Sequence, residues 1–142
     1  MKPTFNVCVI FGTRPETIKL APVIARLSAD PIFKVQNIYT GQHSDLAPEL
    51  VAAFDIKTDR NLDVMTVDQS LSQLLSRIIE ELDLAVSSLN PDMIVVQGDT
   101  TSALAGAMVG SLQQIPIVHI EAGLRTGRND SPFPEEINRR LI

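Results

Sequence analysis

The stretch Met93-Ile-Val-Val-Gln97, followed by Gly98-Asp-Thr-Thr101, decides the fold class of this 142-residue chain. Its apolar residues form a continuous run rather than an alternating one, which predicts a strand that is buried on both faces. Residues 98–101 then predict a tight turn, and residues 102–112 predict a helix. A strand, a turn and a helix in this order are typical of a parallel α/β unit.

The same pattern recurs on both sides of this unit. Strands are predicted at residues 6–11, 34–39 and 115–120, and helices from Pro15 onward, at 46–54, at 71–89 and after Pro134. This alternation predicts an α/β fold of the Rossmann-like type, a doubly wound and mostly parallel sheet with right-handed crossovers. At 142 residues, the chain is expected to form one domain.

Two helices carry further predictions. The first is expected to kink at Pro22 and to bury an apolar face made of Ile18, Leu20, Ala21, Ile24, Ala25 and Leu27. In the helix over 102–112, Gly106 and Gly110 indicate close packing against the sheet.

The composition excludes several classes of protein. The formal charge is −5, with 12 Lys and Arg against 17 Asp and Glu, which argues against nucleic-acid binding through many phosphate contacts. No apolar stretch reaches the roughly 18 to 20 residues of a membrane span, and the start lacks the pattern of a signal peptide. We therefore expect a cytoplasmic protein without a membrane segment. The single cysteine, Cys8, lies in an apolar run and is expected to be a core residue.

Polar residues follow three of the predicted strands. Gly12-Thr-Arg14 comes after the strand at 6–11, Gly98-Asp-Thr100 after the strand at 93–97, and Glu121 after the strand at 115–120. In doubly wound sheets the binding crevice lies outside the carboxyl ends of the strands, so these residues should meet there. Arg14, with Lys19 about one helical turn further on, could bind an anion; alternatively, Arg14 pairs with Asp99 or Glu121.

Carboxylates dominate this predicted site. Asp99 and Glu121 could hold different protonation states and act as general base and general acid. Asp99 could instead cap the following helix, as could Thr100 or Thr101. Glu135 and Glu136 stand in the first turn of the last helix, where the helix dipole accounts for one of them but not obviously for both.

Two histidines have open roles. His43, in the loop Thr40-Gly-Gln-His-Ser44, could contact a ligand or be a solvated loop residue. His119 shares a strand face with Glu121, and it either orients that carboxylate or is a satisfied core histidine.

Motifs for cofactors and metals are absent from the sequence. There is no G-x-G-x-x-G after the first strand, no phosphate-binding P-loop, no H-E-x-x-H and no Cys/His cluster. We therefore expect proton-transfer or group-transfer chemistry on an anionic substrate, with no cofactor and no metal.

Six motifs in order resemble the non-hydrolysing UDP-N-acetylglucosamine 2-epimerases. They are Phe11-Gly-Thr-Arg-Pro-Glu16, Ile18-Lys-Leu-Ala-Pro22, Thr40-Gly-Gln-His43, Gln97-Gly-Asp-Thr-Thr101, His119-Ile-Glu-Ala-Gly-Leu-Arg-Thr-Gly127 and Ser131-Pro-Phe-Pro-Glu-Glu136. The resemblance covers essentially the whole chain.

The resemblance implies two Rossmann-like domains with a cleft between them, the GT-B arrangement, as a homodimer that serves cell-surface polysaccharide biosynthesis. Residues 1–142 would be the N-terminal domain, incomplete at its C-terminal end, with the second sugar-nucleotide-binding domain outside this chain. The implied reaction interconverts UDP-N-acetylglucosamine and UDP-N-acetylmannosamine by anti elimination of UDP to 2-acetamidoglucal, followed by syn re-addition.

The resemblance also implies roles for particular residues. Asp99, Glu121 and Glu135 are the implied acid/base residues, and the implied substrate-binding residues are Arg14, Lys19, Gln42, His43 and Arg125. Gln42 and His43 match a region that contributes to a second, regulatory UDP-N-acetylglucosamine site in bacterial members. The alternatives are a GT-B glycosyltransferase, an epimerase that hydrolyses its product, and a non-catalytic sugar-nucleotide-binding module.

Overall fold

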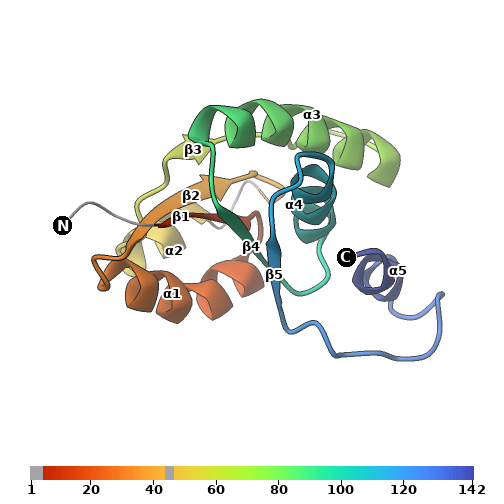
Figure 1. The fold of residues 1–142 in the computed structure, drawn as a ribbon. Helices are drawn as coiled ribbons and strands as arrows, with labels where there is room; N and C mark the ends of the chain where they lie inside the picture. Colours follow the sequence, from red (N-terminus) through yellow and green to blue (C-terminus); the bar gives the residue numbers. More distant parts are fainter. Residues whose placement is uncertain (1–4, 44–46) are drawn as a thin grey trace.

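A computed structural model describes residues 5–43 and 47–142. Its centre is a parallel sheet in the order β3-β2-β1-β4-β5 (Figure 1). The strands are β1 (Phe5–Phe11), β2 (Phe33–Tyr39), β3 (Arg60–Asn61), β4 (Met93–Gln97) and β5 (Ile117–Ile120). The predicted doubly wound, Rossmann-like architecture is confirmed.

Helices cover both faces of the sheet (Figure 1). The helices are α1 (Arg14–Ser28), α2 (Ala47–Ala53), α3 (Leu71–Leu89), α4 (Thr101–Leu112) and α5 (Glu135–Leu141). One apolar core lies between the sheet and α3 and α4, and a second lies between the sheet and α1 and α2. The short helix α5 packs beside α4. The strands are therefore buried on both sides, as their continuous apolar runs predict.

Strand pairing brings the ends of the strands together at one edge. β1 pairs with β2 from Phe5 opposite Phe33 to Phe11 opposite Tyr39, and with β4 from Val7 opposite Met93. Because all strands are parallel, the turns that follow them lie at the same edge of the sheet.

The long helix α3 and the strand β4 have the predicted bounds. Ser70 and Gln73 form a capping box at the start of α3, and Asn90 ends the helix in the left-handed region with φ of 46°. β5 begins at Ile117 rather than at the predicted residue 115, and the sequence pattern does not predict the short strand β3. The predicted start of the second helix, Leu46, lies outside the described residues.

The first helix buries only part of the predicted face. Ile18 is 46% exposed and Ala25 is also exposed, whereas Glu16 and Thr17 are buried with Leu20, Ala21 and Ile24. The helix continues through Pro22. The buried positions follow one helical stripe, which includes polar residues because its first turn faces the polar edge of the sheet.

Cys8 is fully buried in the core, as predicted, and burial raises the pKa of its thiol to about 12. None of the helices in the described part of the chain is long and apolar enough to span a bilayer.

The predicted close packing of α4 on the sheet is confirmed. A Cβ at Gly106 would lie 2.9 Å from Val96 Cγ1, and one at Gly110 would lie 2.9 Å from Ile117 Cγ1. These glycines let the helix backbone approach the side chains of β4 and β5.

We expect Gly106→Val to destabilise the protein by about 1 to 3 kcal/mol, because the larger side chain overpacks this contact. The measurement is urea denaturation followed by circular dichroism. Ser111→Val, at an exposed position of the same helix, is the control for β-branching. Equal stability of the two variants would contradict the packing argument.

Candidate functional site

A cavity of about 410 Å³ lies at the carboxyl edge of the sheet. Its walls come mainly from the turns after β1, β2, β4 and β5 and from α1 and α5. The sequence-predicted site residues that line it are Lys19, Gln42, His43, Asp99, Glu121 and Glu135. Neither Arg14 nor Arg125 lines it.

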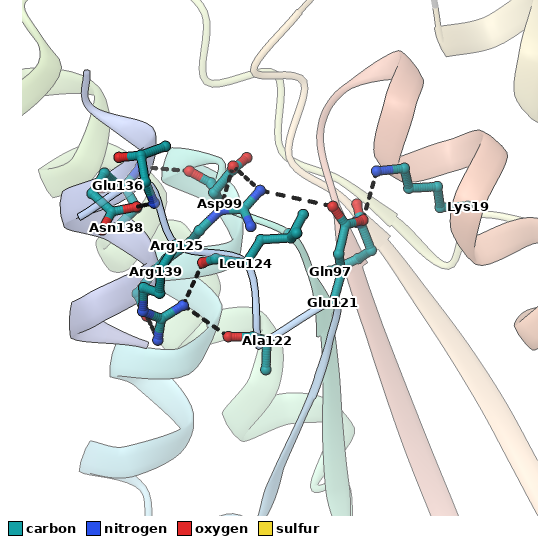
Figure 2. Close-up of polar contacts among 12 residues, drawn as sticks. Lys19, Gln97, Asp99, Glu121, Ala122, Leu124, Arg125, Glu136, Asn138 and Arg139 are labelled. Atoms are coloured by element: carbon teal, nitrogen blue, oxygen red, sulfur yellow. Dashed lines mark hydrogen bonds and ion pairs between the residues drawn. The ribbon is translucent and has the colours of Figure 1, made fainter. Parts of the chain in front are cut away.

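Glu121 is the first residue after β5, and its backbone has a φ of 63°. Non-glycine residues rarely adopt this left-handed conformation, and it turns the chain sharply at the strand end. Glu121 Oε2 accepts hydrogen bonds from Lys19 Nζ at 2.6 Å and from Gln97 Nε2 at 2.7 Å. Figure 2 shows Lys19 reaching this carboxylate from one side and Arg139 from the other.

These contacts lower the pKa of the Glu121 carboxyl. The hydrogen bond from Lys19 has the largest effect, and partial burial opposes it. The charges of Lys19 and Arg139 and the hydrogen bond from Gln97 lower the pKa further. Glu121 is therefore ionised at neutral pH.

Arg139 lies between two carboxylates. Its guanidinium contacts Asp99 Oδ2 from Nε at 2.7 Å and from Nη2 at 2.5 Å, and Nη2 is 3.7 Å from Glu121 Oε1 (Figure 2). Asn138 Nδ2 also donates to the carbonyl oxygen of Asp99 at 2.8 Å. The last helix thus holds the turn after β4 by side-chain contacts.

Asp99 does not cap α4. Thr100 does so, because its Oγ1 accepts a hydrogen bond from the backbone NH of Ala103 at 3.0 Å. The interpretation of Asp99 as the helix cap is therefore wrong. Its carboxylate instead contacts Arg139.

The two glutamates at the start of α5 differ. Glu136 is buried and accepts hydrogen bonds from the backbone NH of Thr126 at 2.9 Å and of Gly127 at 3.3 Å, so it holds the preceding loop. Glu135 lines the cavity, and its Oε2 is buried without a hydrogen-bond partner in the described part of the chain, as is Arg139 Nη1. Buried polar atoms normally have a hydrogen-bond partner, so these two atoms are suited to form hydrogen bonds with a ligand.

The turn after β2 is tied to its neighbours. Gln42 Oε1 accepts from Ser102 N at 3.0 Å and from Ser102 Oγ at 2.7 Å. The backbone NH of His43 donates to Gly12 O at 3.1 Å, and the His43 residue is exposed. These contacts place Gln42 beside the start of α4 and His43 beside the turn after β1.

His119 has its own partner. Its Nε2 lies 2.7 Å from the carbonyl oxygen of Gly98, so it bridges β5 to the turn after β4 rather than orienting Glu121. The interpretation as a satisfied histidine is the one that the contacts support.

The chain is similar to known proteins. The sequence model of the UDP-N-acetylglucosamine 2-epimerase family matches residues 25–142. The chain belongs to this family. It is 42% identical over 136 residues to UDP-N-acetylglucosamine 2-epimerase of Escherichia coli (strain K12), covering 96% of this chain and 36% of that relative.

Solved structures of relatives superpose closely on this member of the epimerase family. The UDP-GlcNAc 2-epimerase from Neisseria meningitidis bound to UDP-GlcNAc has a TM-score of 0.92 and 42% identity, over 96% of this chain and 37% of that one. The enzyme from Methanocaldococcus jannaschii in complex with UDP-GlcNAc and UDP has a TM-score of 0.89 and 34% identity, over 96% of this chain and 37% of that one. The chain thus spans little more than a third of these relatives.

Two predicted residues of the epimerase-family site lie outside the cavity. Arg14 is exposed at the start of α1, and the alternative that it pairs with Asp99 or Glu121 is not supported, because Arg139 and Lys19 occupy those carboxylates. Arg125 donates to the carbonyl oxygens of Ala122 at 2.9 Å and Leu124 at 2.7 Å (Figure 2).

Sequence reasoning missed two members of the site, Arg139 and Glu16. Arg139 has no local signal, because α5 reaches the carboxylates only through tertiary packing. Glu16 lines the cavity and is fully buried, and burial raises the pKa of its carboxyl against the effect of its hydrogen bonds. The spacing Thr13-x-x-Glu16 is that of a capping box and could have drawn attention to it.

We expect Lys19→Met to raise the pKa of Glu121 toward the ordinary value of about 4.3, because the largest influence that lowers it is removed. The measurement is a carbon NMR titration of the protein with labelled glutamate carboxyls. Lys34→Met, which removes an exposed lysine of β2, is the control. A Glu121 pKa that does not move in Lys19→Met would contradict the assignment.

Proposed function

We propose that the protein containing this chain is a UDP-N-acetylglucosamine 2-epimerase that interconverts UDP-N-acetylglucosamine and UDP-N-acetylmannosamine. The chain would be the N-terminal Rossmann-like domain of a two-domain, GT-B-type enzyme, incomplete at its C-terminal end. The family match supports this proposal, as do the structures of relatives in complex with UDP-GlcNAc. The observation that carries it is a single cavity lined by Asp99, Glu121 and Glu135 together with Lys19 and Arg139.

The proposed reaction needs both carboxyl groups and cations. In the elimination step, a carboxylate takes the proton from C2, the C1–C2 double bond forms, and the bond from C1 to the UDP oxygen breaks. In the addition step UDP returns to C1, and a protonated carboxyl gives C2 a proton on the other face. A positioned base and a positioned acid supply these transfers, and cations stabilise the departing diphosphate.

The residues fit these roles in different ways. Glu121 is ionised, and Glu135 Oε2 lacks a partner among the described residues, so both are able to accept a proton from substrate. Asp99 completes the acid/base set. Lys19 already forms an ion pair with Glu121 and would also contact the diphosphate.

The remaining predicted residues would bind substrate around the cavity. Arg14 stands between Thr13 and Pro15, which both line the cavity, and its exposed side chain is available to a phosphate. We also retain Gln42, His43 and Arg125 as substrate-binding candidates. A homodimer in the cytoplasm, acting in cell-surface polysaccharide biosynthesis, belongs to the same proposal, and light scattering of the full-length protein tests the dimer.

The test is proton NMR of UDP-N-acetylglucosamine in D2O with the full-length protein that carries this chain. We expect deuterium at C2 and formation of the manno epimer, because the proton is exchanged with solvent between elimination and re-addition. Free N-acetylmannosamine with UDP would instead identify a hydrolysing enzyme. Absence of C2 exchange would contradict the proposal and favour a glycosyltransferase or a binding module.

In the same protein, Glu121→Gln should lower kcat by about 100-fold or more, since the shape is kept and the proton-transfer group is lost. The matched control is Glu81→Gln, the same change at an exposed position of α3. Circular dichroism should show both variants folded. Wild-type turnover in Glu121→Gln would remove this residue from the catalytic set.

A further inference from the structure

Glu16 is a charged residue type at a fully buried position in the first turn of α1. Its carboxylate accepts three hydrogen bonds. Oε2 accepts from the backbone NH of Gly12 at 2.9 Å and from Thr13 Oγ1 at 2.8 Å, and Oε1 accepts from Thr100 Oγ1 at 2.6 Å. The side chain therefore joins the turn after β1 to the turn after β4.

Helix capping accounts for only part of this arrangement. In a capping box the threonine hydroxyl accepts from the helix backbone, whereas the Thr13 hydroxyl donates to Glu16. All three donors of Glu16 are uncharged, so no ion pair among them offsets the cost of burying a carboxylate. Burial raises the pKa of this carboxyl, and the hydrogen bonds lower it only in part. An uncharged residue at this position would avoid the cost of burying a carboxylate, so stability alone does not explain Glu16.

Glu16 contacts elements that carry or neighbour the proposed acid/base residues Asp99 and Glu121. On α1, Lys19 follows Glu16 by about one helical turn and contacts Glu121 at 2.6 Å. In the turn after β4, Thr100 directly follows Asp99, which contacts Arg139. Thr100 Oγ1 also caps α4 while it donates to Glu16. Glu16 is thus the side chain that connects the element carrying Lys19 to the turn carrying Asp99.

We propose that Glu16 is a positioning residue that sets the spacing between Asp99 and the Lys19–Glu121 pair across the cavity. This inference rests on the proposed function, since it concerns the geometry in which that reaction occurs. Displacing a catalytic group by about 1 Å costs up to about 100-fold in rate, so this spacing affects kcat more than substrate affinity.

Hydrogen bonds that do not involve Glu16 also stabilise the carboxyl edge of the sheet. The hydroxyls of Thr40 and Ser102 lie 2.8 Å apart, and Gln42 accepts two hydrogen bonds from Ser102. These contacts hold the start of α4 without Glu16, so a change at Glu16 is expected to leave the protein folded.

The experiment uses Glu16→Gln in the full-length protein. Glutamine keeps the shape, but its single oxygen cannot accept from three donors that reach both carboxylate oxygens. We expect kcat for epimerisation to fall about 10- to 100-fold with KM within about threefold of wild type. The backbone NH of Gly12 should also exchange faster with D2O. Glu81→Gln is the matched control and should behave as wild type.

A second pair of variants covers the case in which Glu16→Gln does not fold. Thr100→Val removes the hydroxyl that donates to Glu16, and Thr100→Ser keeps it. We expect the valine variant to lose kcat and the serine variant to recover most of it. Equal kcat in these two variants, or wild-type kcat and KM in a folded Glu16→Gln, would overturn the positioning role. Failure of the wild-type protein to epimerise would instead be the failure of the proposed function.

Discussion

The parallel pairing of β1 with β2 on one side and β4 on the other is the constraint on which the rest of the structure depends. It pairs the backbone of β1 along both of its edges, and it brings the turns that follow these strands to one crowded edge of the sheet. Gly12 shows how tight this edge is, because a Cβ at this position would collide with the hydroxyls of Thr40 and Ser102. The polar side chains of the turns satisfy one another there, and the cavity lies among them.

Shared cations determine the chemistry of this cavity. Lys19 contacts Glu121, and Arg139 lies between Glu121 and Asp99, so these two cations lower the pKa of the Glu121 carboxyl. Under the proposed function, a diphosphate that draws Lys19 away would raise the pKa of Glu121. Glu121 would then be a stronger base when substrate is present than when the site is empty.

Local sequence signals predicted most of the fold and some of the residues that line the cavity. Continuous apolar runs identified the buried strands, and Asn90-Pro91 marked the end of α3 at the right residue. The rule for parallel sheets correctly brought Asp99 and Glu121 to one edge. Arg139 was missed because α5 returns to the sheet edge by tertiary packing, which no periodicity encodes. The buried face of α1 was predicted only in part, because its first turn buries Glu16 and hydrophobicity gives no weight to a buried carboxylate.

The most direct test of this account is a crystal structure of the full-length protein with UDP-N-acetylglucosamine. We predict that the sugar lies in the cavity at the carboxyl edge, with C2 about 3 to 3.5 Å from a carboxylate oxygen of Asp99, Glu121 or Glu135. The unpaired Glu135 Oε2 and Arg139 Nη1 should acquire partners on the ligand. A sugar bound away from this cavity, with these contacts unchanged, would contradict the account.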